Sequence, residues 1–152
     1  MIEFNCRFGD PETEVVLPRL QSDIYAIFEA IASGKPVPRI FWSDCTTMGF
    51  VMASKGYPGE YEKGFEITGL DHIPSNVKIY HMGTKLDENG KTVTSGGRVL
   101  MVVGMGEGGH FSPQVVKADL HVAHDRALWS VQHTVKCDNL FYRRDIGWRV
   151  LE

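Results

Sequence analysis

The sequence lacks the features that mark secreted, membrane-spanning or disulfide-stapled proteins. Its 152 residues include three cysteines, Cys6, Cys45 and Cys137, and no CxxC pair. Scattered cysteines in odd number indicate reduced thiols rather than a disulfide framework. No apolar run approaches the roughly 20 residues that span a bilayer, and the first residues have neither the basic start nor the apolar stretch of a signal peptide. We therefore expect a cytoplasmic protein with no membrane partner.

Strong charge of either sign is also missing. The net charge is -3, which gives no reason to expect nucleic acid or an anionic membrane as a partner. Hydrophobic residues make up 43% of the chain and charged residues 23%, the balance of an ordinary globular protein. The length fits one domain, or one compact domain with a short appendage.

The first residues alternate between apolar and polar side chains. This period of two over residues 1–7 predicts a short strand with Glu3, Asn5 and Arg7 on one face. Residues 9–12 (GDPE) end that strand, and Pro11 suits the first position of a following helix. A chain that begins within a strand suggests a missing N-terminal partner.

A helix and a linker are expected next. Apolar residues recur at helical spacing over residues 20–31, with Ser22 as N-cap and with Gly34 and Pro36 ending the helix. Residues 35–38 contain two prolines and form the best linker candidate in the sequence.

The remainder of the chain predicts a small antiparallel sheet with one late helix. A hairpin is expected at Asn89-Gly90, and an amphipathic helix over residues 120–135. The fold class is therefore α+β, a strand–helix remnant followed by a small antiparallel β-rich domain with a late packed helix. The expected strands are residues 46–53, 77–81, 91–94, 98–103 and 148–151.

The carboxylate of Glu3 and the carboxamide of Asn5 form an E-x-N pair. Hard cations such as Mg²⁺ prefer oxygen ligands, and a rigid strand would present both groups together. Taken alone, such a tripeptide is more typical of the wet face of an edge strand. A zinc site at the three histidines His121, His124 and His133 is disfavoured, because no cysteine or carboxylate completes a recognised ligand spacing.

Longer blocks resemble the phosphoribosylamine–glycine ligases, which are ATP-grasp enzymes. The blocks follow the order of that family at about its spacing and cover nearly the whole chain. They are residues 3–13 (EFNCRFGDPET), 16–20 (VLPRL), 54–59 (SKGYPG), 61–64 (YEKG), 81–85 (HMGTK), 94–100 (TSGGRVL) and 141–148 (FYRRDIGW).

The resemblance implies a reaction and a set of site residues. Such enzymes use ATP to phosphorylate the carboxylate of glycine, and the amine of phosphoribosylamine then attacks the acyl phosphate. Glu3 and Asn5 are the implied ligands of Mg²⁺ (or Mn²⁺), and Arg7 the implied catalytic clamp on a phosphate or on the carboxylate of glycine. Asp10 and Glu12 would bind substrate or orient Arg7; alternatively, they complement a helix dipole.

Two other blocks are ambiguous. Ser95-Gly96-Gly97-Arg98 could bind an anion, although a purely structural turn is the favoured interpretation. Arg143-Arg144-Asp145 could line the active-site cleft, but an ion pair is favoured.

The chain departs from the family pattern in two places. The nucleotide-binding grasp and the N-terminal substrate domain, which precede the E-x-N block in the family, are absent from these 152 residues. Residues 1–36 would then be the C-terminal edge of the ATP-grasp domain, and residues 37–152 a β-rich domain that resembles that of biotin carboxylase. The stretch 104–119 also differs, since it is rich in glycine where the family has an acidic, Ala-rich helix start.

Three functions remain open at this point. The chain is part of a ligase for glycine and phosphoribosylamine and is inactive alone, or it is a non-catalytic β-rich module. Such a module would dock the missing N-terminal domains as a separate chain, or self-associate through exposed apolar surface. The third possibility, an unrelated small β-rich binding protein, would make the ordered blocks a coincidence.

Overall fold

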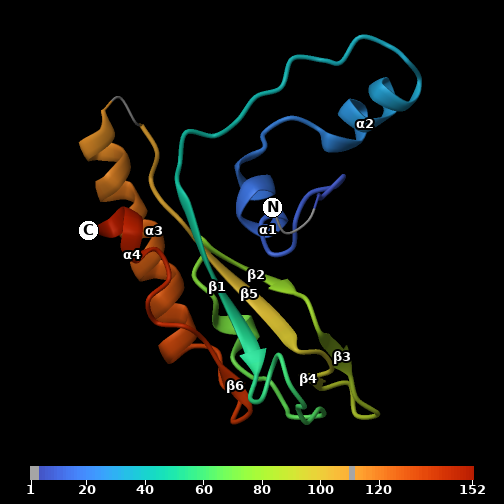
Figure 1. Ribbon diagram of the computed structural model, residues 1–152, viewed down its shortest axis with the longest axis vertical. Coiled ribbons are helices and arrows are strands. Elements are labelled where there is room, and N and C mark those ends of the chain that lie inside the picture. Colours follow the sequence, from blue (N-terminus) through green and yellow to red (C-terminus); the bar gives the residue numbers. More distant parts are fainter. Residues whose placement is uncertain (1–3, 110–111) are drawn as a thin grey trace.

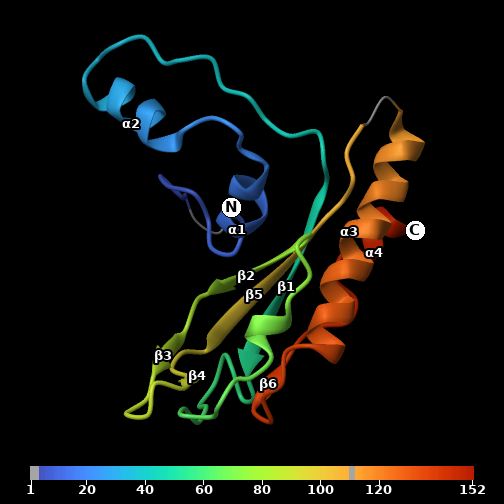
Figure 2. The ribbon, with the colours of Figure 1, turned by 180° about the vertical axis from the view of Figure 1, so that it is seen from behind.

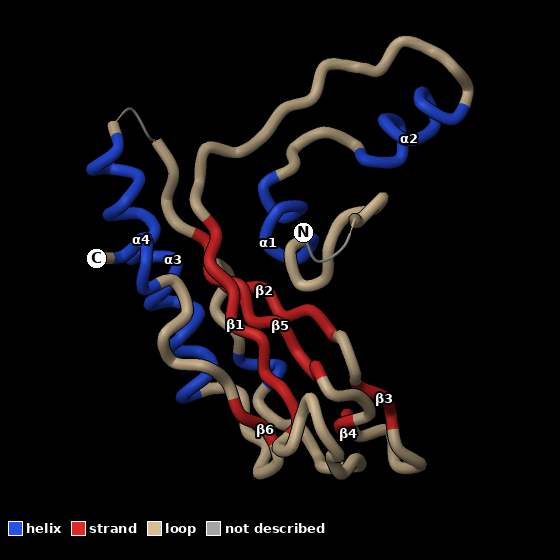
Figure 3. Tube along the Cα trace, in the orientation of Figure 1, coloured by secondary structure: helices blue, strands red, loops and turns tan. Residues whose placement is uncertain are grey.

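The computed structural model describes residues 4–109 and 112–152. A four-stranded antiparallel sheet in the order β2-β5-β1-β6 forms its centre, and the long helix α3 crosses one face of that sheet (Figures 1 and 3). The helices are α1 (Thr13–Val16), α2 (Ile24–Ala32), α3 (Pro113–His133) and α4 (Trp148–Leu151), with 3₁₀ turns at Leu17–Arg19 and Leu70–His72. The strands are β1 (Thr47–Ser54), β2 (Val77–His81), β3 (Thr84–Leu86), β4 (Thr92–Thr94), β5 (Arg98–Met105) and β6 (Leu140–Phe141). Within the described residues, no helix is both long and apolar enough to cross a membrane.

The core lies between the sheet and α3. Phe50 of β1 and Val102 of β5 are directly opposite each other and fully buried in one cluster with Ala127 of α3. Gly104 allows the helix to approach closely, because a Cβ at this position would overlap the α3 backbone at Ala123. The sheet and late helix predicted from the sequence are therefore confirmed.

A β-bulge in β5 changes the face to which Arg98 belongs. Met52 pairs with Leu100, but the next residue, Ala53, pairs with Arg98, so Val99 is the extra residue. Side chains of directly paired residues lie on the same face of a sheet. Without the bulge, Arg98 would share the α3 face with Leu100; with it, Arg98 lies on the opposite face.

The N-terminal part packs against that opposite face. The hydroxyl of Thr47 on β1 donates a hydrogen bond of 2.6 Å to the carbonyl of Val15 on α1. Beyond α1, helix α2 and the connection that follows it extend away from the sheet in both views (Figures 1 and 2). Residues 35–38, the predicted linker, are exposed and without regular structure.

The predicted helix over residues 20–31 is found as α2, with a different cap. Asp23 is the N-cap, and its carboxylate accepts hydrogen bonds from the amides of Tyr25 and Ala26. The hydroxyl of Ser22, the predicted cap, instead accepts a 2.7 Å hydrogen bond from the amide of Phe41.

Three predictions about the first residues and the last strand need correction. Residues 4–7 of the predicted strand are exposed and irregular, and none of the strands in the described part of the chain pairs with them; Met1, Ile2 and Glu3 lie outside the described residues. Pro11 does not begin a helix, since α1 starts two residues later at Thr13. The predicted strand over 148–151 is the helix α4, because Gly147 (φ 83°) turns the chain and its carbonyl accepts from the amide of Val150 at 2.9 Å.

The hairpin at Asn89-Gly90 is confirmed. It joins β3 to β4. Strand β4 was expected from the sequence, whereas β3 was not. The carboxylate of Asp87 accepts hydrogen bonds from the amides of Asn89 and Lys91, and these bonds lower the pKa of that carboxyl.

Candidate functional site

A turn of the N-terminal segment is tied to the sheet on the face opposite α3. Nη1 of Arg98 donates a 2.6 Å hydrogen bond to the carbonyl oxygen of Asp10, and the same nitrogen lies 3.4 Å from the Asp10 carboxylate. The bulge at Val99 makes this contact possible, because it places Arg98 on this face. Two motif blocks far apart in the sequence therefore meet here.

An apolar cavity of about 260 Å³ lies next to this contact. Its floor is the sheet, with β1 and β5 contributing, and its walls come from the N-terminal turn and from the segment after β6. The lining residues are Pro11, Gly49, Val51, Ala53, Tyr57, Met101, Phe141, Tyr142, Arg143 and Ile146.

The double-glycine turn before β5 gives Tyr57 its place in the cavity wall. A Cβ at Gly97 would overlap the Tyr57 ring. The buried hydroxyl of Ser54 donates a 2.9 Å hydrogen bond to the carbonyl of Gly96, which fixes the turn against β1. The turn therefore positions both Tyr57 and Arg98, in addition to reversing the chain.

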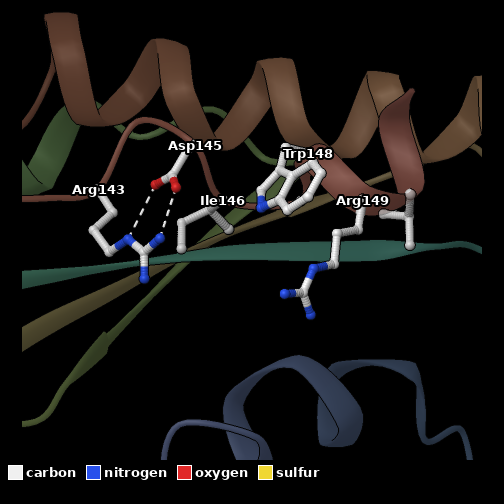
Figure 4. A pocket seen from close by; sticks show the side chains of 7 residues that line it. Arg143, Asp145, Ile146, Trp148 and Arg149 are labelled. Atoms are coloured by element: carbon white, nitrogen blue, oxygen red, sulfur yellow. Dashed lines mark hydrogen bonds and ion pairs between the residues drawn. The ribbon is translucent and has the colours of Figure 1, made fainter.

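A second cavity of about 360 Å³ adjoins the first and is more polar (Figure 4). The two cavities share Arg143 and Ile146. Arg143 binds Asp145 through two hydrogen bonds of 3.0 and 2.6 Å, and this pairing raises the pKa of Arg143 and lowers that of Asp145. The ion pair expected in this block is therefore present, and its arginine also lines both cavities. The guanidinium of Arg149 lies 5.2 Å from the ring centre of Trp148.

The predicted substrate residues Arg7, Asp10 and Glu12 line neither of these two cavities. Arg7 is exposed, and its Nη1 donates a 2.8 Å hydrogen bond to the carbonyl of Phe8. Glu12 is exposed and folds back over Gly9, where a Cβ would overlap its carboxylate. Asp10 alone among the three contacts the sheet, through Arg98. The catalytic role of Arg7 and the substrate roles of all three stay predictions.

Of the two predicted metal ligands, Glu3 and Asn5, the structure describes only Asn5. Asn5 is exposed in irregular backbone, and Glu3 lies outside the described residues. Across 4–109 and 112–152, no group of three or more His, Cys, Asp or Glu side chains could hold a metal ion. A site of two oxygen donors still suits Mg²⁺, because Mg²⁺ keeps several waters and takes further oxygens from phosphates.

The histidines of α3 make separate contacts. Nε2 of His121 lies 3.1 Å from the carbonyl of Leu151, and Nδ1 of His133 lies 3.0 Å from the carbonyl of Trp129. Nδ1 of His124 lies 2.9 Å from the Asp125 carboxylate, while its ring packs against Phe50.

The sequence favours structural roles for the blocks that contain Arg98 and Arg143, yet Arg143 lines both cavities and Arg98 binds Asp10 beside the first. One signal could have pointed to Arg98. Two consecutive glycines before it indicate close approach of other groups to the backbone. The shared position of Arg143 in both cavities has no local signal, since it depends on how residues 141–148 pack against β1.

Comparisons with known proteins give a consistent result. The family model described as phosphoribosylglycinamide synthetase, C domain, matches residues 47–149. The phosphoribosylamine–glycine ligase of Halalkalibacterium halodurans is 42% identical over 151 residues, covering 99% of this chain and 32% of that protein. The trifunctional purine biosynthetic protein adenosine-3 of Gallus gallus is 41% identical over an alignment of 155 residues that covers 99% of this chain and 14% of that protein.

A solved structure agrees with these relatives. The crystal structure of phosphoribosylamine–glycine ligase from Thermotoga maritima matches with a TM-score of 0.71 and 30% identity, over 97% of this chain and 33% of that one. The chain therefore spans about a third of the length of the ligases that it matches.

Proposed function

This chain belongs to the phosphoribosylglycinamide synthetase C-domain family, and from that membership we propose that it is the C-terminal part of a phosphoribosylamine–glycine ligase. The observation that carries the proposal is the identity of 42% to such a ligase over 99% of the chain. The resemblance found in the motif blocks is confirmed by the same match. The names of the relatives support a role in purine biosynthesis.

The proposed reaction joins glycine to 5-phosphoribosylamine at the expense of ATP. The carboxylate oxygen of glycine attacks the γ-phosphorus of ATP and releases ADP. The amine of phosphoribosylamine then attacks the carbonyl carbon of the glycyl phosphate, losing a proton, and phosphate leaves as the amide forms. Little covalent chemistry falls to the protein, so positioning and charge stabilisation provide most of the rate acceleration.

Glu3 and Asn5 are the residues that would hold Mg²⁺. When bound there, Mg²⁺ would supply positive charge that stabilises phosphoryl transfer. Asn5 is exposed and therefore accessible to a nucleotide bound by another part of the ligase. Arg7, two residues further along, would pair with an anionic oxygen of glycine or of phosphate. Asp10 and Glu12 would bind the amine of a substrate or orient Arg7.

A second function is favoured by the exposed apolar side chains of the N-terminal part. Tyr25, Phe28 and Ile31 of α2 are 71%, 53% and 59% exposed. Such a surface would suit docking of the chain as a β-rich module against other ligase domains, since this chain covers only 32% of the Halalkalibacterium halodurans ligase. Both functions can belong to one protein.

A chimeric ligase tests the proposal. We would replace the matching third of the Halalkalibacterium halodurans ligase with this chain and measure ADP release with Mg²⁺, glycine and fresh phosphoribosylamine. We expect glycine-dependent ADP formation, and a loss of at least about a hundredfold in Glu3→Ala, because the metal and its charge are central to phosphoryl transfer.

The matched control is Glu88→Ala, which removes an exposed carboxylate at the hairpin turn. A folded chimera without activity would contradict the ligase assignment, and an active Glu3→Ala chimera would contradict the metal role. The unmodified 152-residue chain should release no ADP above its own Glu3→Ala variant.

A further inference from the structure

Residues 4–8 contain the predicted site residues Asn5 and Arg7, but they form no regular structure. All five are exposed, and none of the strands in the described part of the chain pairs with them. Site residues need rigid support to keep a productive geometry. An irregular segment of this kind takes its position from the points at which it is attached to the fold.

Asp10, two residues beyond this segment, is such a point. Nη1 of Arg98 donates a 2.6 Å hydrogen bond to the carbonyl oxygen of Asp10 and lies 3.4 Å from its carboxylate. The side chain of Asp10 is 50% exposed, so water screens the ion pair more than the hydrogen bond to the carbonyl. The contact therefore acts mainly through the backbone of Asp10 and fixes the path of the chain.

Arg98 can hold the chain because its own backbone is fixed. The amide of Ser54 donates a 2.8 Å hydrogen bond to the carbonyl of Gly97, and the carbonyl of Val99 accepts a 3.0 Å hydrogen bond from the amide of Met82. Gly97 and Val99, the two neighbours of Arg98, are both buried. The sheet thus gives Arg98 a rigid base from which its guanidinium reaches the turn.

Other contacts hold the turn together and attach α1 to the sheet without Arg98. The carbonyl of Gly9 accepts hydrogen bonds from the hydroxyl of Thr13 and, at 3.0 Å, from its amide. The carbonyl of Val15 accepts the 2.6 Å hydrogen bond from Thr47 of β1. Loss of the Arg98 contact should therefore loosen residues 4–8 and leave α1 in place.

We propose that Arg98 is a positioning residue for residues 4–8. Through the carbonyl of Asp10 it sets where Asn5 and Arg7 lie relative to the sheet, and Asp10 contributes its backbone rather than its carboxylate. The consequence for phosphoryl transfer, correct placement of a metal ligand and of a charge clamp, rests on the proposed function.

A nitroxide on Cys6 measures the mobility of the segment in the 152-residue chain without any ligase activity. Cys6 is exposed and Cys45 is buried, so a Cys137→Ala background leaves Cys6 as the accessible thiol. We expect Arg98→Met to shorten the rotational correlation time of the label at least about twofold, because unanchored loops move within nanoseconds. Arg98→Lys should keep most of the restraint, since an ammonium also donates to a carbonyl. Unchanged mobility in Arg98→Met would overturn the proposal.

Two further variants separate the carbonyl contact from charge and from general loss of stability. Asp10→Asn removes the carboxylate charge but keeps the backbone acceptor, so the label should stay as restrained as in the original chain. Mobility equal to that of Arg98→Met would assign the contact to the carboxylate and overturn the backbone role. Lys91→Met is the matched control: it removes one positive charge from the ion pair with Glu66 and should leave the label unaffected. Equal mobilisation by Lys91→Met would overturn the positioning role.

The chimeric ligase provides the functional readout. Arg98→Met should lower kcat about tenfold or more and raise the Mg²⁺ concentration that gives half the maximal rate, because small displacements of site groups are costly. The KM for phosphoribosylamine should change less than about twofold, and Arg98→Lys should recover most of kcat. A raised KM with unchanged kcat would mean that Arg98 contacts the substrate and would overturn the positioning role.

The two experiments separate this inference from the proposed function. An inactive chimera together with Arg98-dependent mobility of the label would contradict only the proposed function. An active chimera whose rate does not depend on Arg98 would contradict only this inference.

Discussion

At the residue scale, Arg98 links the N-terminal turn to the sheet through the carbonyl of Asp10. Its side chain is about one-third exposed, so solvent screens the accompanying ion pair and the carbonyl hydrogen bond contributes most. We expect Arg98→Met to lower the free energy of unfolding by about 0.5–1 kcal/mol in urea denaturation. Chymotryptic cleavage after Phe8 should become several-fold faster.

The control for this change is Lys91→Met, which breaks an exposed ion pair with Glu66 on the far hairpin. It should leave cleavage after Phe8 unaltered. Unchanged cleavage in Arg98→Met would mean that the turn is held by other contacts, such as the hydrogen bond from Thr47 to Val15.

Gly97 has a role that depends on a single neighbour, the ring of Tyr57. Gly97→Ala should displace that ring and destabilise the fold by about 1–3 kcal/mol, the usual cost of overpacking. In a Tyr57→Ala background the same change should cost less than half as much, because the clash is gone. A double-mutant cycle in urea measures this coupling, and additive effects would contradict it.

Some of the residues discussed above stand out in the sequence, and others do not. The E-x-N block and Arg7 stand out in the sequence because they belong to one contiguous motif, and their roles stay predictions. The pairing of Arg98 with Asp10 could not, since it depends on a bulge at Val99 that shifts the register by one residue. Alternation alone would have placed Arg98 on the α3 face.

At the scale of elements, Asp119 joins α3 to the start of β1 and to the loop after β5. Its carboxylate accepts from the hydroxyl and amide of Thr46 at 2.7 and 2.9 Å, and from the amides of Glu107 and Gly108 at 2.6 and 3.4 Å. Burial alone would raise the pKa of Asp119, but these hydrogen bonds outweigh burial and lower it.

This lowered pKa predicts a loss of stability in acid. In the folded state the pKa of Asp119 lies below its unfolded value of about 3.9. The ionised carboxylate therefore makes its full contribution to stability above roughly pH 5. As the pH falls through the unfolded pKa and on through the lower folded pKa, that contribution disappears. Asp119→Asn should cost about 1–3 kcal/mol at pH 7 and flatten the acid limb of the stability profile.

Urea unfolding of both proteins between pH 3 and 7 measures the difference. Asp71→Asn, at an exposed carboxylate in the Leu70–His72 turn, is the matched control and should reproduce the original profile. An acid limb as steep in Asp119→Asn as in the original chain would assign the acid sensitivity to other carboxylates.

Elements with strong local patterns were predictable, and elements set by their neighbours were not. The long strands β1 and β5, the helix α3 and the hairpin at Asn89-Gly90 follow from apolar runs, helical periodicity and turn chemistry. The short β6 exists only because it pairs with Ala53 and Ser54. Trp148–Leu151 has a strand-like composition, but Gly147 turns the chain and local hydrogen bonds give a helix.

At the scale of the whole molecule, the arrangement follows from the two faces of one sheet. One face is closed by α3 and forms the core. The other receives α1, the turn at Asp10 and the cavity floored by β1 and β5. Such an arrangement leaves the core independent of the binding surface.

The part of the molecule beyond this face carries several exposed apolar side chains. Phe28 of α2 is 53% exposed, and Phe41 and Trp42 of the connection that follows are 51% and 45% exposed. Burial of apolar surface stabilises association by roughly 25 cal/mol per Å², so exposed side chains of this kind favour contact between copies. We expect the 152-residue chain to show concentration-dependent dimerisation in sedimentation equilibrium.

Phe28→Asp should weaken that association by at least about tenfold, because a carboxylate would have to be buried at the contact. Leu86→Asp makes a matched change at a residue that is 67% exposed on the hairpin formed by β3 and β4, far along the chain from α2. It should leave the dimerisation constant unchanged. Equal effects of the two variants would mean that association is not located at α2, and a monomer at all concentrations would show that this surface does not associate in the absence of another partner.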